Sequence, residues 1–281
     1  MSGSTNMDFL AAMARASQDR VARARELMPQ GELAARVSAL PAAPRLTLSP
    51  DGFDLIAEVK LRSPAAGQLK AGTEDIVARA AAYADAGAAA ISVLTEPSRF
   101  DGALSHLTQA VAAVAGRIPV MRKDFLVDAY QVYEARLAGA GGVLVILRML
   151  DRQQIEAQLE VVSQLGMFAL LEAFDAEDLA LAAQLVYEYR DRARLLVGVN
   201  CRDLATLKVV PNRLEALAPL LPAAVPRVAE SGVSTAADAA RLSAHGYDVA
   251  LVGSALMQAE QPLALAAALL AAGRVAAAGR A

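Results

Sequence analysis

The sequence predicts an α/β fold, a (β/α)8 TIM barrel with an N-terminal helical extension. First, eight short apolar runs rich in β-branched residues alternate with eight helical patterns, and the runs recur about every 20 to 35 residues, as in βα units. Second, the chain has 281 residues, 56% of them hydrophobic, which is enough for one large core. Third, the turn at residues 62–67 lacks the glycine-rich pattern of an open dinucleotide-binding sheet, so a closed barrel is favoured.

Strands and helices are predicted from residue 53 onward. The expected strands are residues 55–61, 90–95, 119–124, 142–147, 168–174, 195–201, 226–231 and 249–253. The expected helices are residues 75–86, 103–114, 129–138, 152–165, 176–186, 213–221, 235–244 and 262–272. Four glycines mark the ends of predicted helices just before the next strand, as is typical of helix C-termini: Gly87, Gly139, Gly166 and Gly246. We therefore expect residues 51–281 to form the barrel domain.

Residues 1–50 precede this alternation and are predicted to form a separate helical extension. Apolar residues recur at helical spacing between residues 8 and 27, and the connector that follows contains Pro41, Pro44 and Pro50. We expect the extension to cover one end of the barrel or to line its mouth.

Charge, cysteine content and hydropathy limit the possible classes of protein. The formal net charge is −3, whereas a nucleic-acid binder usually has a basic excess, so no nucleic-acid partner is expected. Cys201 is the single cysteine, which excludes an intramolecular disulfide. The apolar stretch at residues 263–272 is shorter than the roughly 20 residues that cross a bilayer, and the N-terminus lacks a secretory pattern. We expect a cytoplasmic protein without membrane contact, as a monomer or weak homodimer.

Ionisable residues gather where the predicted strands end. Glu58 and Lys60 share one face of the first strand, because residues two apart in a strand point the same way. Further strands end with Lys123, Glu172, Asn200, Arg202 and Glu230. Barrel active sites lie at these ends, so we expect the side chains to meet in one pocket. An ion-pair plug without function is the alternative, although barrel interiors are usually filled by apolar layers.

The ends of the last two strands indicate a phosphate site. Ser231-Gly232 follows the seventh strand and Gly253-Ser254 follows the eighth, where a short helix is predicted to begin near Ser254. Free backbone N–H groups bind anions in these loops of many barrels. The alternative is that the glycines only form tight turns.

These residues belong to motifs that resemble the indole-3-glycerol phosphate synthase family over roughly residues 50–265. The matching segments, in the order of the family, are residues 56–60, 63–64, 91–96, 122–125, 130–136, 198–204, 230–233 and 251–257. The resemblance implies a small anionic, phosphorylated substrate, 1-(2-carboxyphenylamino)-1-deoxyribulose 5-phosphate. It also implies ring closure followed by loss of carbon dioxide and water, in tryptophan biosynthesis, with no cofactor and no metal.

Catalytic roles follow from the same resemblance. Lys123 matches the general acid that activates the ketone, and Lys60 lies close enough in the motif to share this role. The order in which the two lysines donate protons stays open. Glu172 matches the base, while Glu58 and Asn200 match residues that position the reacting centre. Burial beside a second cation is expected to lower the pKa of the catalytic lysine.

Substrate-binding roles are implied in the same way. Arg202 and Lys60 suit the substrate carboxylate, and Phe100 and Phe125 are expected to form walls for the anthranilate ring. Glu230 lies in the motif that leads to the phosphate loop. The expected phosphate contacts are Ser63, Gly232, Gly253 and Ser254, with Ser231 beside them.

The sequence departs from the family at positions that leave other functions open. Leu61, Ala65, Cys201 and the pair Ala173-Phe174 replace commoner residues. Alternatives are a diverged paralogue with an altered substrate and a non-catalytic barrel that binds a phosphate ligand. A phosphoribosylanthranilate isomerase would need a cysteine near the end of the first strand, where this chain has Glu58 and Lys60. A Schiff-base aldolase would use Lys123 as its nucleophile.

Overall fold

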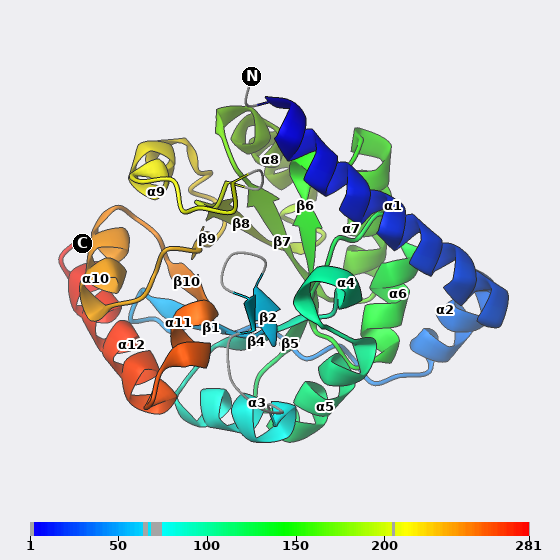
Figure 1. Ribbon diagram of the computed structural model, residues 1–281, viewed down its shortest axis with the longest axis horizontal. Helices are drawn as coiled ribbons and strands as arrows, with labels where there is room; N and C mark the ends of the chain where they lie inside the picture. The colour runs from blue at the N-terminus through cyan, green and yellow to red at the C-terminus, as the bar shows by residue number, and fades with distance from the viewer. Residues whose placement is uncertain (1–2, 64–66, 69–74, 204–205, 281) are drawn as a thin grey trace.

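The computed structural model describes residues 3–63, 67–68, 75–203 and 206–280. It confirms the predicted barrel, because eight parallel strands close in the order β1-β10-β9-β8-β7-β6-β5-β4 (Figure 1). The strands are β1 (Asp54–Val59), β4 (Ala90–Leu94), β5 (Val120–Lys123), β6 (Gly142–Ile146), β7 (Phe168–Ala173), β8 (Arg194–Asn200), β9 (Arg227–Glu230) and β10 (Val249–Val252). A short antiparallel pair, β2 (Arg62–Ser63) and β3 (Gly67–Gln68), follows β1.

The N-terminal helices precede the first strand, and the other helices lie in the segments that follow the barrel strands. They are α1 (Gly3–Leu27), α2 (Gln30–Ser38), α3 (Ile76–Asp85), α4 (Pro97–Phe100), α5 (Leu104–Val114), α6 (Tyr130–Leu137), α7 (Arg152–Gln164), α8 (Ala176–Tyr189), α9 (Arg213–Leu217), α10 (Ala236–Ala244), α11 (Ser254–Gln258) and α12 (Pro262–Ala278), with 3-10 turns η1 (Leu147–Met149) and η2 (Ala218–Leu220). Side chains cap several N-termini, and Asp151 and Thr235 each form a reciprocal capping box.

The helix ends differ most from the prediction in α9 and α12, and most of the predicted strands are one or two residues shorter in the structure. The helix expected at residues 213–221 stops at Leu217, because Pro219 lacks the N–H that would continue it and a 3-10 turn follows. The final helix continues past Gly273, where a Cβ would lie only 2.5 Å from Phe53 Cγ, so this glycine permits close packing instead of ending the helix. The first strand ends at Val59, so Lys60 lies just beyond it.

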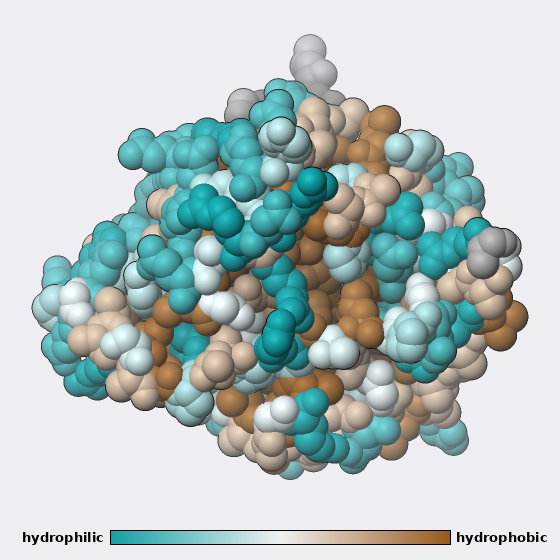
Figure 2. All heavy atoms as spheres, turned by 180° about the vertical axis from the view of Figure 1, so that it is seen from behind, coloured by the Kyte–Doolittle hydropathy of each residue, from teal (hydrophilic) through white to brown (hydrophobic). Residues whose placement is uncertain are grey.

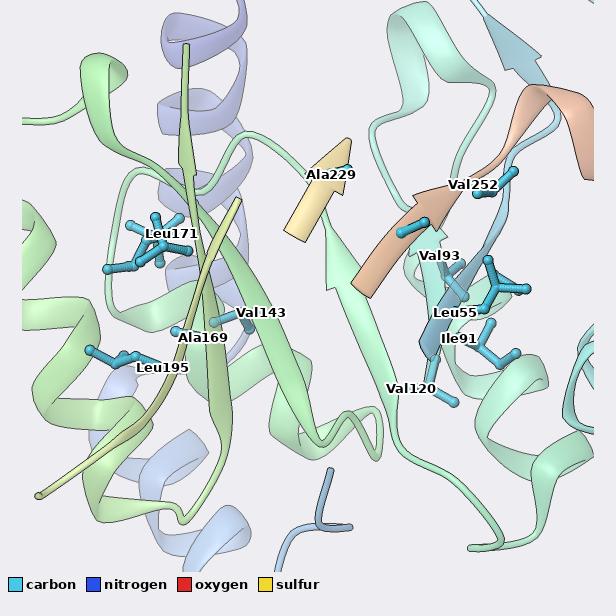
Figure 3. Close-up of a cluster of buried hydrophobic side chains, with 14 of the residues drawn as sticks. Leu55, Ile91, Val93, Val120, Val143, Ala169, Leu171, Leu195, Ala229 and Val252 are labelled. Carbon is cyan, nitrogen blue, oxygen red and sulfur yellow. The ribbon is translucent and has the colours of Figure 1, made fainter. Parts of the chain in front are cut away.

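Alternation along the strands divides the core into two layers. Leu55, Ile91 and Val93 pack between the strands and the surrounding helices, as Figure 3 shows for part of this cluster. Ile56 and Leu170 point the other way, into a second buried cluster inside the barrel. Burying each such side chain contributes about 1.5–3 kcal/mol, so the alternation strongly determines which residues face the barrel interior.

Of the N-terminal helices, α1 lies against the end of the barrel that Figure 1 faces, and α2 lies at its rim. In that view α1 passes in front of α7 and α6 and leads to α2, which contacts α6. Leu10 and Met13 of α1 join the cluster inside the barrel. The division of the chain at residue 50 stays a prediction.

The surface behind this view mixes hydrophilic and hydrophobic side chains (Figure 2). No helix in the described ranges is both long and apolar enough to cross a membrane.

Candidate active site

A cavity of about 330 Å³ opens where the barrel strands end. All residues that the sequence placed in a site line this cavity: Glu58, Lys60, Ser63, Phe100, Lys123, Phe125, Glu172, Asn200, Arg202, Glu230, Ser231, Gly232, Gly253 and Ser254. They come from six of the eight barrel strands or the loops after them, together with α4 and α11. The roles that the family resemblance implies for them stay proposals.

Lys123, the last residue of β5, lies among carboxylates. Its Nζ donates a hydrogen bond to Glu230 Oε2 at 2.7 Å and lies 3.6 Å from Glu172 Oε1. Glu172 Oε1 also accepts a hydrogen bond of 2.6 Å from Asn200 Nδ2. These side chains therefore form one connected polar network across β5, β7, β8 and β9.

Glu58 and Lys60 form a second ion pair in the same cavity. Lys60 Nζ lies 2.6 Å from Glu58 Oε1, and the Glu58 side chain is nearly inaccessible. Burial acts to raise the pKa of Glu58, but the charges of Lys60, Lys123 and Arg202 hold it below its usual range. Glu58 is therefore a carboxylate at neutral pH, and its charge balances that of the lysine.

The pKa of Lys123 is raised, so the expectation of a lowered pKa was wrong. Burial by itself lowers the pKa of this lysine, but Glu230, Glu172 and Glu58 surround it and raise the pKa well above its ordinary value. Burial raises the pKa of Glu230 to about 8, although Lys123 partly opposes the change. The sequence showed the second cation but not the three carboxylates that converge on this lysine.

Side chains on either side of Lys123 fix the end of β5. Arg122 is buried and donates hydrogen bonds to Thr95 Oγ1, to the Gln131 carbonyl and to a carboxylate oxygen of Asp124. Asp124 also accepts a hydrogen bond of 2.7 Å from Arg20 of α1. Arg122 and Asp124 are thus bound by residues of the surrounding helices α6 and α1. The Lys123 side chain between them points the other way, into the barrel.

An aromatic wall borders the cavity, and one member of it was missed by sequence reasoning. The ring centroids of Phe100 and Phe125 lie 6.1 Å apart, and Phe9 of α1 contacts Phe125 edge-on with centroids 5.9 Å apart. Phe9 lines the cavity as well. Its place at an apolar position of the N-terminal helix was the only available signal, and that position is equally typical of packing.

The opposite side of the cavity is formed by the loops that follow β9 and β10, which contain serine and glycine. Ser231 and Gly232 have consecutive left-handed φ angles of 67° and 72°, and the predicted short helix begins at Ser254. A Cβ at Gly232 would lie 2.9 Å from Cys201 Sγ, so the loop passes too close to Cys201 for a larger residue. Pro64 and Ala65, which follow Ser63 in the motif, lie outside the described residues.

Arg202 and Cys201 follow β8 and point in different directions. Arg202 lines the cavity and donates a hydrogen bond of 2.6 Å to the Leu207 carbonyl. Cys201 is buried, and its Sγ lies 3.2 Å from the Ser231 carbonyl. Burial raises the pKa of this thiol to about 11, which suits a packing residue and not a nucleophile. In the described ranges, no group of three or more His, Cys, Asp or Glu residues is arranged to hold a metal.

The fold and the site define a (β/α)8 barrel with an ionisable cavity at the C-terminal ends of its strands, which is where barrel enzymes bind substrates. The family model for indole-3-glycerol phosphate synthase matches residues 10–269. The chain therefore belongs to the indole-3-glycerol phosphate synthase family.

Individual relatives agree with this assignment. Indole-3-glycerol phosphate synthase of Leifsonia xyli subsp. xyli is 41% identical over 90% of this chain and 95% of its own length. The protein of the same name from Mycolicibacterium smegmatis is 40% identical over 97% of this chain and 96% of its own length. Among solved structures, 3-hexulose-6-phosphate synthase of Salmonella typhimurium superposes with a TM-score of 0.60 over 82% of this chain and 100% of its own, at 16% identity, which reflects the shared fold alone.

Proposed function

We propose that this protein is an indole-3-glycerol phosphate synthase, which converts 1-(2-carboxyphenylamino)-1-deoxyribulose 5-phosphate to indole-3-glycerol phosphate. The observation that carries the proposal is the position of Lys123. Its ammonium group hydrogen-bonds to Glu230 and lies near Glu172. The cavity around it has an aromatic wall and the serine- and glycine-containing loops after β9 and β10. Family membership is the independent support.

The cavity supports one orientation of the substrate. The anthranilate ring packs against Phe100 and Phe125, and its carboxylate faces Lys60 and Arg202. The phosphate binds at the other side, near the backbone N–H groups of Gly232 and Ser254. This orientation brings the ketone at the middle of the substrate close to Lys123, which lines the same cavity.

Ring closure requires a proton at the ketone oxygen. The aromatic carbon that bears the carboxylate attacks the ketone carbon, while Lys123 donates a proton so that the oxygen becomes a hydroxyl. The raised pKa of Lys123 keeps it protonated at neutral pH, as this step needs. Loss of carbon dioxide then restores the aromatic ring.

Dehydration completes the indole. The hydroxyl leaves as water after accepting a proton from Lys60, and Glu172 removes a proton from the adjacent ring carbon. Asn200 donates a hydrogen bond to Glu172 and so fixes the direction of the carboxylate. Glu58 holds Lys60 in place through their ion pair.

Turnover of the proposed substrate tests this function. We expect the purified wild type to produce indole fluorescence, against which the protein contributes little because it has no tryptophan. Lys123→Ala and Glu172→Gln should each lower kcat by roughly 10²- to 10⁴-fold, as loss of a general acid or base does, with little change in phosphate affinity. Arg36→Ala, in an exposed ion pair of α2, serves as the control.

Other outcomes identify the alternatives. A wild type that binds the compound without turnover would favour a paralogue with an altered substrate or a phosphate-ligand-binding barrel. A Schiff-base aldolase is disfavoured because its lysine must be neutral to attack a carbonyl, whereas the pKa of Lys123 is raised. Trapping of a ketose phosphate on Lys123 with borohydride would reverse that conclusion.

A further inference from the structure

Gly198 occupies a position in β8 where the backbone does not require glycine. It pairs with Glu172 of β7 and Val228 of β9. It shares a strand face with Leu196, which lies inside the barrel, and with Asn200, which lines the cavity. Its φ angle is not in the left-handed region, unlike those of the turn glycines. Conformational freedom therefore does not explain the absence of a side chain here.

Space explains it instead. A Cβ at position 198 would overlap Glu230 Oε1 and would lie 3.2 Å from Glu230 Cδ and 3.1 Å from Leu170 Cδ1. The Glu230 carboxyl group thus occupies the volume that a side chain at position 198 would fill. Gly198 does not line the cavity itself, so it acts only through its neighbour.

The two oxygens of Glu230 are held differently. Oε2 accepts a hydrogen bond from Lys123, whereas Oε1 is buried and has no hydrogen-bond partner among the described residues. The position of Oε1 therefore depends on packing against Gly198. Rotation of the carboxyl group away from this position would also move Oε2 and break its contact with Lys123.

The same arrangement recurs on the neighbouring pair of strands, β10 and β1. A Cβ at Gly253, which follows β10, would overlap Glu58 Oε1 and lie 2.9 Å from Glu58 Cδ. Glu58 forms the ion pair with Lys60. Each active-site lysine therefore has a carboxylate partner that lies against a residue without a side chain.

We propose that Gly198 is a positioning residue, whose missing side chain accommodates the carboxyl group of Glu230 so that this group, which accepts a hydrogen bond from Lys123, directs Lys123 toward the reacting ketone. The catalytic part of this inference rests on the proposed function. The packing part does not, because it concerns only the fit between Gly198 and Glu230.

A double-mutant cycle tests the packing without any substrate. Gly198→Ala should lower the Tm in the wild-type background but much less in a Glu230→Ala background, since no Oε1 remains to be displaced. Equal losses of Tm in both backgrounds would overturn the proposal. If Gly198→Ala alone does not fold, folding of Gly198→Ala/Glu230→Ala supports the proposal, and failure of the double variant as well overturns it.

Kinetics then separates positioning from mere stability. Gly198→Ala should lower kcat about tenfold or more with KM nearly unchanged, because a small displacement of a catalytic group has such effects. It should also shift the pH dependence of kcat, because Glu230 faces Lys123, Glu172 and Glu58. An unchanged kcat and pH profile would contradict the proposal.

Gly142→Ala is the matched control. Gly142 begins β6, away from the cavity, and a Cβ there would lie 2.5 Å from Phe168 Cε1. This variant should lose stability in the same manner but retain the wild-type pH profile. A shift of the pH profile in both glycine variants would contradict the proposal. It would mean that overpacking anywhere in the barrel disturbs Lys123, and that the packing of Glu230 against Gly198 has no special role. If the wild type itself shows no turnover, the proposed function fails, while the Tm cycle still decides the role of Gly198.

Discussion

At the residue scale, three buried glutamates share one cavity with two lysines. Charges are costly to bury alone, and here each lysine has the carboxyl group of a glutamate within hydrogen-bonding distance. Glu58 keeps a lowered pKa because three cations face it, whereas Glu230 has a raised pKa because burial dominates. Carboxylates of the same type therefore differ in proton affinity within one site, as acid–base catalysis requires.

The raised pKa of Glu230 predicts a pH dependence of stability. Its pKa is about 8 in the folded protein and 4.5 ordinarily, so the folded state binds more protons than the unfolded state between these values. This contribution to the free energy of unfolding is complete below about pH 4.5 and is lost as the pH rises through about 8. Glu230→Gln should lack this loss, because the amide does not titrate.

Urea denaturation at about pH 5.5 and about pH 8.5 measures this difference. Wild type and Glu230→Gln share every other titrating group, so the variant is its own control. The stability of the wild type relative to Glu230→Gln should decrease as the pH rises. A difference that is the same at both values would contradict the raised pKa.

At the element scale, α1 is attached to the residue that directly follows β5. Arg20 of α1 hydrogen-bonds to Asp124 and lies 3.5 Å from Glu96, the residue that caps α4. Ser17 accepts a hydrogen bond from the buried Gln131 of α6. Phe9 of the same helix extends the aromatic wall. The N-terminal extension thus contributes to the shape of the cavity as well as to packing.

Removal of Arg20 should weaken this attachment. Arg20→Met keeps much of the side-chain volume but leaves Asp124 with one charged partner fewer. We expect a loss of about 1–2 kcal/mol, or roughly 2–6 °C in Tm. Arg36→Met removes an exposed ion pair within α2 and should cost less than about 0.5 kcal/mol. Equal Tm values for the two variants in thermal denaturation would argue against a structural role for the Arg20 contacts.

At the scale of the whole molecule, large exposed hydrophobic side chains are dispersed. In the described part of the chain they lie on several helices and loops: Leu27, Val77, Leu137, Tyr187, Val209, Leu220, Leu263 and Val275. The face in Figure 2 likewise interrupts its hydrophobic surface with hydrophilic side chains. Stable protein interfaces usually need a larger continuous area.

Sedimentation velocity should therefore detect a monomer of 29.3 kDa or a weak homodimer. A weak dimer would dissociate on dilution to micromolar concentration, which makes a dilution series the appropriate control. A single larger species that persists at every concentration would contradict this prediction.

The sequence by itself determined the order of strands and helices and the set of polar residues at the strand ends. Apolar periodicity depends on neighbours in the chain, and barrel closure places every strand end on one side, so residues such as Lys123 and Glu172 were expected to meet. Pro219 was visible in the sequence as well, although the end of α9 was placed too late.

The tertiary structure decided what depends on distances between remote segments. The pKa of Lys123 is raised because carboxylates from three other strands converge on it, which no local pattern encodes. Phe9 reaches the cavity only because α1 folds back across the barrel. Gly198 looks like any strand glycine until the Glu230 carboxyl group is placed against it. Electrostatic and steric effects act over a few ångströms in space, and the sequence specifies those distances only through the complete fold.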